Sequence, residues 1–230
     1  VYTLVKSILA SAIVVSIPRI SALLKNKDEV AFQSLGAEIY DIFLTLVIPA
    51  IIGIILLNKE IIMLIAGPDF LDANFSLIIL SVALFFCLGA GFWSQWVMIP
   101  QNRENDVFKI TAVSAIANIV LNFILIPLFQ ERAAALTTVM AEAIVFFYCR
   151  SASTKSLDFG SKKDILLKIL AGCIPMILIN LAVKCLISTQ WIIAVLTVGL
   201  CVPLYFSIEY ILGNTAVVKY KKEIMAKLQR

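Results

Sequence analysis

Long apolar runs separated by short polar segments make up most of this chain. A helix needs about 20 apolar residues to cross ~30 Å of hydrocarbon, where every backbone polar group must be satisfied internally. Runs of this kind predict seven membrane-spanning helices, the first of them truncated: 1–17, 37–57, 75–97, 107–129, 133–149, 165–187 and 191–212. We therefore expect an all-α fold, a polytopic membrane helix bundle.

Turn-forming and helix-breaking residues fall between these runs. They are Pro18, Asn58, Gly67-Pro68-Asp69, Pro100-Gln101-Asn102, Gln130-Glu131-Arg132 and the polar segment 151–163. The first residue is Val1, already inside an apolar run, which leads us to expect that the sequence is the C-terminal part of a longer protein.

The composition excludes an ordinary water-soluble enzyme. Hydrophobic residues make up 61% of the chain and charged residues 15%, with a mean hydropathy of +1.00. Soluble domains average roughly 45–50% apolar and about 25% charged residues. A soluble fold of this size would leave large apolar patches in water, whereas lipid removes that problem.

Basic residues are concentrated in alternate connections. Most of the 19 Lys and Arg residues follow the first, third, fifth and seventh spans, and the other connections hold one each: Lys59, Arg132 and Lys184. By the positive-inside rule, this pattern predicts a cytoplasmic C-terminus, a cytoplasmic loop at 151–164 and a basic cytoplasmic tail at 213–230. The tail is either an amphipathic helix on the anionic inner leaflet or a plain solvated segment.

Three tryptophans fit the same layout. Trp93 and Trp96 lie at the predicted cytoplasmic end of the third span, and Trp191 begins the seventh at the opposite face. Tryptophan is enriched at both interfaces of a membrane, so these positions agree with the predicted orientation.

Two ionisable residues fall near the middle of predicted spans, where a charge costs about 2.5–3.5 kcal/mol on insertion scales. Lys6 lies twelve residues before Pro18, or ~18 Å at ~1.5 Å per residue. It either faces an anionic substrate group such as a phosphate, pairs with a neighbouring carboxylate, or snorkels to the interface. Glu142 either binds a coupling proton or cation, balances Lys6, or is a structural carboxyl.

Asn118 and Asn122 are spaced i, i+4, so both project from one face of the fourth predicted span. Amide side chains at membrane depth commonly hydrogen bond to neighbouring helices, and they can also line a polar cavity. The two roles do not exclude each other.

Several kinds of chemistry have no residues to support them. The chain has no histidine, which excludes His-based acid–base catalysis and His metal ligation, and it contains neither GxxxxGK[ST] nor GxGxxG. The five cysteines lie in or beside apolar runs without a CxxC pair and are expected to act as small hydrophobes. We expect no catalytic residues, no cofactor, no metal and no nucleic-acid partner.

Short motifs in a consistent order carry a family resemblance. In chain order, the residues that match are Pro18-Arg19-Ile20-Ser21, Pro49, Gly53, Gly67-Pro68-Asp69-Phe70, Ala73, Asn118, Asn122, Pro127 and the run Ala134-Ala135 to Thr138 and Glu142. With these motifs the chain resembles the polysaccharide-repeat-unit flippases (O-antigen, Wzx-type transporters) of the multidrug/oligosaccharidyl-lipid/polysaccharide exporter superfamily. One departure is Ala133, where the family usually has glycine before the alanine pair.

The resemblance implies a two-lobed, MATE-like transporter. Residues 1–150 would form most of its second six-helix lobe and 165–212 two additional helices. The implied activity is flipping of undecaprenyl-diphosphate-linked oligosaccharide across the bacterial cytoplasmic (inner) membrane by alternating access. The implied partners are this lipid-linked oligosaccharide, membrane lipids, the N-terminal lobe of the same chain and a polysaccharide polymerase. Lys6, Arg19, Asn118 and Asn122 would bind substrate or line the cavity, and Glu142 would couple an ion.

Other functions stay open at this point. A drug/cation antiporter of the same superfamily predicts a cavity rich in carboxylates. A membrane-embedded glycosyltransferase, ligase or acyltransferase of the same pathway needs a catalytic His, paired carboxylates or a sizeable outward loop, and a structural membrane subunit needs no cavity.

Overall fold

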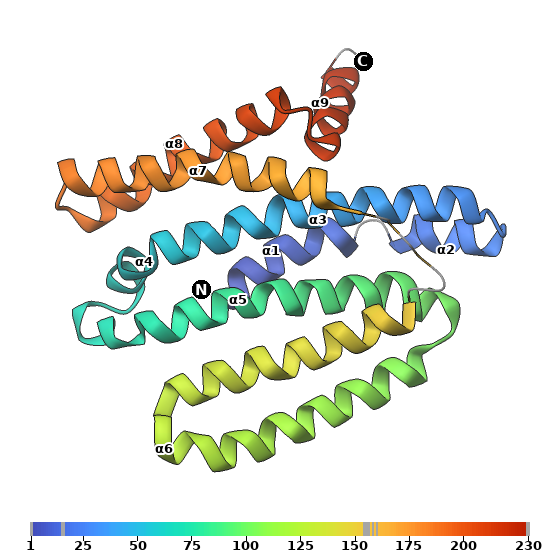
Figure 1. The fold of residues 1–230 in the computed structure, drawn as a ribbon, viewed down its shortest axis with the longest axis horizontal. Coiled ribbons are helices and arrows are strands. Elements are labelled where there is room, and N and C mark those ends of the chain that lie inside the picture. Colours follow the sequence, from blue (N-terminus) through green and yellow to red (C-terminus); the bar gives the residue numbers. More distant parts are fainter. Residues whose placement is uncertain (1, 15–16, 154–156, 158, 160, 229–230) are drawn as a thin grey trace. The chain divides into compact units, whose positions relative to one another are not determined.

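The computed structural model describes residues 2–14, 17–153, 157, 159 and 161–228. Within these ranges the chain is helical and contains no strand (Figure 1). The α-helices are α1 (Tyr2–Val14), α2 (Ile17–Lys25), α3 (Glu29–Leu56), α4 (Asn58–Ile65), α5 (Asn74–Gly91), α6 (Glu104–Ser153), α7 (Lys163–Leu186), α8 (Gln190–Ile211) and α9 (Thr215–Leu228). Three shorter helical segments are η1 (Pro68–Ala73), the π-helix η2 (Phe92–Met98) and η3 (Ile99–Gln101).

Five helical segments of the described chain are long and apolar enough to cross a membrane. They are Glu29–Leu56, Pro68–Gln101, Glu104–Ser153, Lys163–Leu186 and Gln190–Ile211, and they contain the core of every predicted span after the first. Helix α1 is 13 residues long, which is shorter than a full crossing, and residues 15–16 of the predicted first span lie outside the described residues. The prediction of an all-α polytopic membrane bundle is confirmed.

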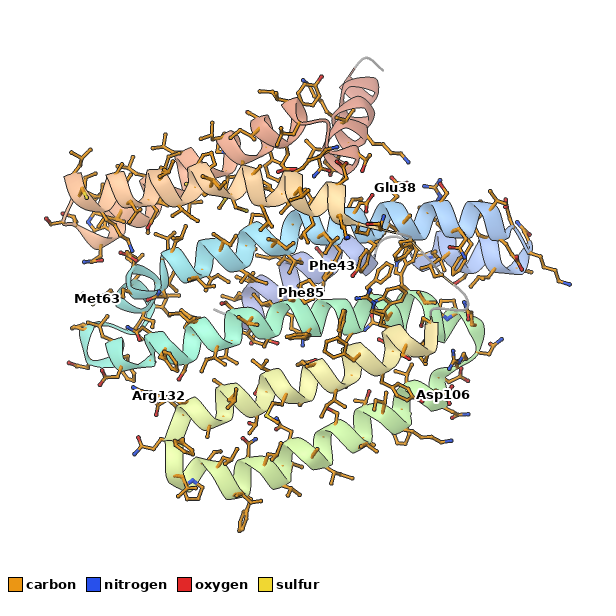
Figure 2. The ribbon with its side chains drawn as sticks, in the orientation of Figure 1. Glu38, Phe43, Met63, Phe85, Asp106 and Arg132 are labelled. Atoms are coloured by element: carbon orange, nitrogen blue, oxygen red, sulfur yellow. The ribbon has the colours of Figure 1, made fainter. Side chains whose placement is uncertain are left out.

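Helix α6 accounts for two predicted spans because it bends sharply at Gln130 (φ 54°, ψ −134°). The predicted break at Gln130-Glu131-Arg132 is therefore confirmed, and Figure 2 labels Arg132 at the bend and Asp106 near the other end of the hairpin. There the Arg103 guanidinium donates to Asp106 Oδ2 (3.0 Å) and, through Nη1, to the carbonyl oxygen of Ala152 (2.8 Å). One side chain thus ties the start of the hairpin to its end.

The polar segment between the first two predicted spans is largely helical. Residues 17–25 form α2, and α3 begins at Glu29, eight residues before the predicted span. The backbone reverses at Lys27 (φ 54°), and Asp28 Oδ1 then accepts a hydrogen bond from the Ala31 amide (3.0 Å), which caps the new helix. Hydropathy detects only the apolar part of a helix, so it missed the polar first turns of α3.

Packing divides the chain into two compact units. Unit 1 comprises Val1–Ala37 and Ala73–Phe159, and unit 2 comprises Glu38–Asp72 and Gly160–Arg230. In unit 1, α5 packs against both α1 and the α6 hairpin, and in unit 2, α8 packs against α7, α4 and α9. The prediction of a six-helix lobe at 1–150 with two added helices stays a prediction, and residues 154–156, 158 and 160 of the predicted loop lie outside the described residues.

Trp93 and Trp96, at the end of the third predicted span, are buried inside the protein. Their exposed fractions are 3% and 0%, and Trp96 stacks on Phe92 with ring centroids 5.6 Å apart. Trp93 lies 5.5 Å from the ring of Phe159. Phe92, Trp93 and Trp96 belong to the π-helix η2, and Phe159 packs on it. Trp191, in contrast, is 58% exposed at the start of α8.

The C-terminal tail is helical. Lys219 Nζ lies 2.6 Å from Glu38 Oε2, and Lys221 Nζ lies 3.8 Å from the centroid of the Tyr210 ring. A helical tail fits the predicted alternative of an amphipathic helix. Residues 229–230 are outside the described range, and contact of the tail with the inner leaflet stays a prediction.

Gly172 in α7 is a point of close approach within unit 2. A Cβ added there would lie 2.5 Å from Glu209 Oε1 and 3.1 Å from ring carbons of Tyr205. We predict that Gly172→Ala lowers the free energy of unfolding by about 1–3 kcal/mol, because overpacking forces the two helices apart. Thermal unfolding of the full-length protein in detergent measures this.

Gly199→Ala in α8 is the matched control, because nothing lies within 4 Å of its Cβ position. A glycine-to-alanine change in an open helical position stabilises by up to about 1 kcal/mol. Equal unfolding temperatures for the two variants would contradict the tight packing at Gly172.

Candidate functional site

Three helices of unit 1 bring polar groups together around Lys6. The half-buried Lys6 side chain on α1 lies close to the Cys87 thiol on α5 and within electrostatic range of Glu142 on α6. The Cys87 thiol also lies close to Glu142, so it is near both the cation and the carboxyl. Tyr2, one turn before Lys6, lies with its ring centroid 6.0 Å from Lys6 Nζ.

The geometry of this group narrows the alternatives for Lys6 and Glu142. A lysine at membrane depth requires an opposite charge or a wet cavity, and here a carboxyl is within reach. The structure therefore agrees with the alternative in which Glu142 balances Lys6. The further roles, substrate contact for Lys6 and ion coupling for Glu142, stay predictions.

Asn118 and Asn122 belong to a hydrogen-bonded ladder between the two arms of the α6 hairpin. Asn122 Nδ2 donates to Asn118 Oδ1 (2.8 Å), and the Thr137 hydroxyl donates to Asn122 Oδ1 (2.5 Å). One turn earlier on the first arm, the Ser114 hydroxyl donates to the carbonyl oxygen of Ala141 on the second arm (2.8 Å). Asn122 therefore makes the predicted interhelical hydrogen bond, and cavity lining stays a prediction for both amides.

Arg19 stands apart from these groups. It is exposed on α2, and among the contacts of the described residues none joins it to Lys6, Cys87 or Glu142. Its predicted place at the cytoplasmic mouth of a cavity stays a prediction.

The sequence did not single out Cys87 or Thr137. Cys87 was expected to be a small hydrophobe, and no pattern in the sequence shows that it lies close to both Lys6 and Glu142. Thr138 belongs to the family motif, but its hydroxyl donates to Ala134 O of its own helix (2.8 Å), whereas the fully buried Thr137 reaches across to the other arm. The sequence did contain one indication of the ladder: Ser114, Asn118 and Asn122 are spaced i, i+4, i+8 and therefore lie along one face of the helix.

Unit 2 contains a buried ion pair of its own. Lys184 Nζ on α7 lies 2.8 Å from Glu60 Oε1 on α4 and donates to the carbonyl oxygen of Leu56 at the end of α3 (2.7 Å). The Glu60 side chain is only 5% exposed. Lys184 therefore holds the break between α3 and α4 against the last turn of α7.

The interhelical bond of Asn122 generates a prediction. Asn122→Ala removes the acceptor that Thr137 uses across the hairpin, and we expect it to lower the free energy of unfolding by about 0.6–2 kcal/mol, the range for polar contacts between membrane helices. Thr138→Ala is the matched control, because its hydrogen bond stays within one helix. Thermal unfolding in detergent measures both, and an Asn122→Ala protein as stable as the wild type would contradict the role of the ladder.

Taken together, the long apolar helical segments and the polar groups between them define a multi-pass membrane protein. A comparison with family models identifies the family: the model described as "Lipid II flippase MurJ" matches residues 1–206. The chain belongs to this family. Flippases are transporters rather than enzymes, which confirms that part of the prediction.

A curated relative agrees with this assignment at low identity. The capsular polysaccharide biosynthesis protein CapF of Staphylococcus aureus is 26% identical over 136 residues, which are 58% of this chain and 34% of the relative. The match thus spans about a third of the relative's length. Both comparisons support a flippase family for lipid-linked precursors, which is broader than the predicted O-antigen group.

Proposed function

We propose that this chain is part of a flippase that moves undecaprenyl-diphosphate-linked oligosaccharide from the cytoplasmic to the outer leaflet by alternating access, for assembly of surface polysaccharide. The family match over residues 1–206 carries the proposal, and the similarity to a capsular polysaccharide biosynthesis protein supports the oligosaccharide as cargo. The protein is proposed to lie in the bacterial cytoplasmic membrane.

The chemistry of Lys6 suits a diphosphate headgroup. An ammonium group at membrane depth attracts phosphate oxygens strongly because the surroundings screen the charge weakly. Glu142 and Cys87 lie within interaction range of this ammonium group, so a diphosphate would compete with Glu142 for it. Glu142, once displaced, would take up a proton or a cation, which gives it the coupling role. The proposal also assigns substrate binding or cavity lining to Arg19, Asn118 and Asn122.

Lipid II is the second candidate cargo, because the matching family model is described as a lipid II flippase. The two cargoes are separated by complementation. Surface polysaccharide restored in cells that lack their oligosaccharide flippase supports the first cargo, and growth restored in cells depleted of their lipid II flippase supports the second. Drug resistance without either result would indicate the antiporter alternative.

Substitution of Lys6 tests the site. We predict that Lys6→Ala and Lys6→Glu in the full-length protein reduce complementation by about tenfold or more, since loss of a charged contact to a diphosphate costs more than about 1.4 kcal/mol, which is tenfold in binding. The amount of surface polysaccharide, measured beside the membrane level of each variant, is the readout. Normal export by both variants would show that Lys6 is not a substrate contact.

Two companion variants sharpen this result. Lys25→Ala removes an exposed lysine at the end of α2 and is expected to export normally. Glu142→Gln keeps the size of the side chain and removes its charge, so we expect it to change the pH dependence of export. A Glu142→Gln protein with wild-type export and wild-type pH dependence would reduce Glu142 to a structural residue.

The proposed orientation places the C-terminus in the cytoplasm, with the N-terminal lobe of the same chain, membrane lipids and a polysaccharide polymerase as partners. We predict that a cysteine at Lys162 is labelled only from the cytoplasmic side and a cysteine at Lys59 only from the outside, because basic connections stay inside. Membrane-impermeant thiol labelling of intact cells and inverted vesicles measures this. Labelling of both positions from one side would overturn the orientation.

A further inference from the structure

A second polar cluster, in unit 2, is centred on a carboxyl group that the proposed transport function does not use. Glu209 in α8 is 0% exposed. Its Oε2 accepts a hydrogen bond from Asn214 Nδ2 (2.6 Å), and the same amide donates to Thr45 Oγ1 (3.1 Å). The other oxygen, Oε1, is buried and has no hydrogen-bond partner in the described part of the chain.

The cluster joins four helices of unit 2. Helix α3 contributes Thr45, whose carbonyl oxygen accepts a hydrogen bond from the Tyr205 hydroxyl of α8 (2.9 Å). Asn214 also caps α9, because its Oδ1 accepts the Ala216 amide (3.0 Å). Helix α7 closes the cluster at Gly172, where the missing Cβ leaves room for Glu209 Oε1. The start of α9 is therefore held by the same amide that contacts Glu209.

The charged groups around this cluster are engaged elsewhere. On α7, Lys168 Nζ lies 2.8 Å from Asp164 Oδ2 and 3.4 Å from the carbonyl oxygen of Gly213. Lys168 is within electrostatic range of Glu209, and the other titratable side chains near Glu209 are Cys173 and Tyr205. At the start of α9, Asp41 accepts a hydrogen bond from Thr215 and is paired with Lys162, and Lys219 is paired with Glu38. None of the ion pairs found among the described residues includes Glu209.

A fully buried carboxylate with one neutral donor is strongly unfavourable, whereas a carboxylic acid is tolerated there. We propose that Glu209 is a proton-binding site and that its neutral, protonated form holds the start of α9 against α3, α7 and α8. The step is a simple acid dissociation: the O–H bond of the carboxyl breaks, the carboxylate keeps the electron pair, and the proton passes to water. The site is independent of Lys6 and of the identity of the transported lipid.

Loss of the proton has a structural consequence. The carboxylate then requires water or Lys168, and either can enter only if the Asn214 cap and the first turn of α9 separate from the cluster. Because the docked state binds one proton more than the open state, its stability falls as pH rises. Glu209→Gln imitates the neutral acid and is expected to keep α9 docked at every pH.

Infrared spectroscopy of the full-length protein tests the protonation directly. We expect the difference spectrum of wild type minus Glu209→Gln at neutral pH to contain the carbonyl band of a protonated carboxylic acid. Glu209→Asp keeps a carboxyl and moves this band, so it provides the assignment if the Gln variant does not fold. A difference spectrum that contains only carboxylate bands would overturn the proposal.

Thiol labelling tests the link to α9. Ala216→Cys places a thiol at a buried position of α9 (6% exposed). Tyr220→Cys places a control thiol at an exposed position of the same helix (63% exposed). In both variants the exposed Cys185 is replaced by Ser. The control corrects for the pH dependence of thiol reactivity itself. We expect the ratio of the two labelling rates, position 216 over position 220, to rise with pH by up to about tenfold per unit, the limit for release of one proton.

The labelling ratio should become independent of pH when Glu209→Gln is added. A ratio that is already flat in the wild-type background, or that still rises with pH in the Gln variant, would overturn the coupling between Glu209 and α9. The proposed transport function is tested by complementation and not by these labelling rates. Both labelled positions lie in unit 2, whereas Lys6 and Glu142 lie in unit 1, so the two proposals can fail independently.

Discussion

The structure depends on one constraint: a polar group inside hydrocarbon must find its partner within the protein, because lipid offers none. The two arms of α6 meet through Ser114, Asn122 and Thr137, whose hydrogen bonds cross from arm to arm. Lys184 joins α7 to the break between α3 and α4 in the same way. Apolar surface places these helices in the membrane, whereas the polar contacts select which faces of the helices meet.

The same constraint makes intramembrane charges suitable for a moving protein. Lys6 has Cys87 and Glu142 nearby, so in the proposed mechanism a competing anion would replace the carboxyl without leaving the ammonium group unpaired. Glu209 belongs to none of the ion pairs found among the described residues, and in the proposal its charge state is tied to whether its surroundings stay closed.

Sequence patterns predicted the long helices and their breaks well, because about 20 consecutive apolar residues and the residues Gly67, Asn102 and Gln130 act locally. They failed where a helix continues into polar sequence, as at the start of α3. They also did not show that Trp93 and Trp96 are buried, because that burial depends on contacts with rings such as Phe159 in another part of the chain.

The sequence alone determined that this is an all-α membrane protein, where most of its spans lie and which polar residues occur at membrane depth, because hydropathy and charge are properties of each residue. Only the tertiary structure decided that Cys87 lies close to both Lys6 and Glu142, that Thr137 rather than Thr138 reaches Asn122, and that Glu209 has an unpartnered oxygen. Those facts depend on how helices far apart in the chain are rotated against one another. Rotation is set by the packing of many side chains together, which no local pattern encodes.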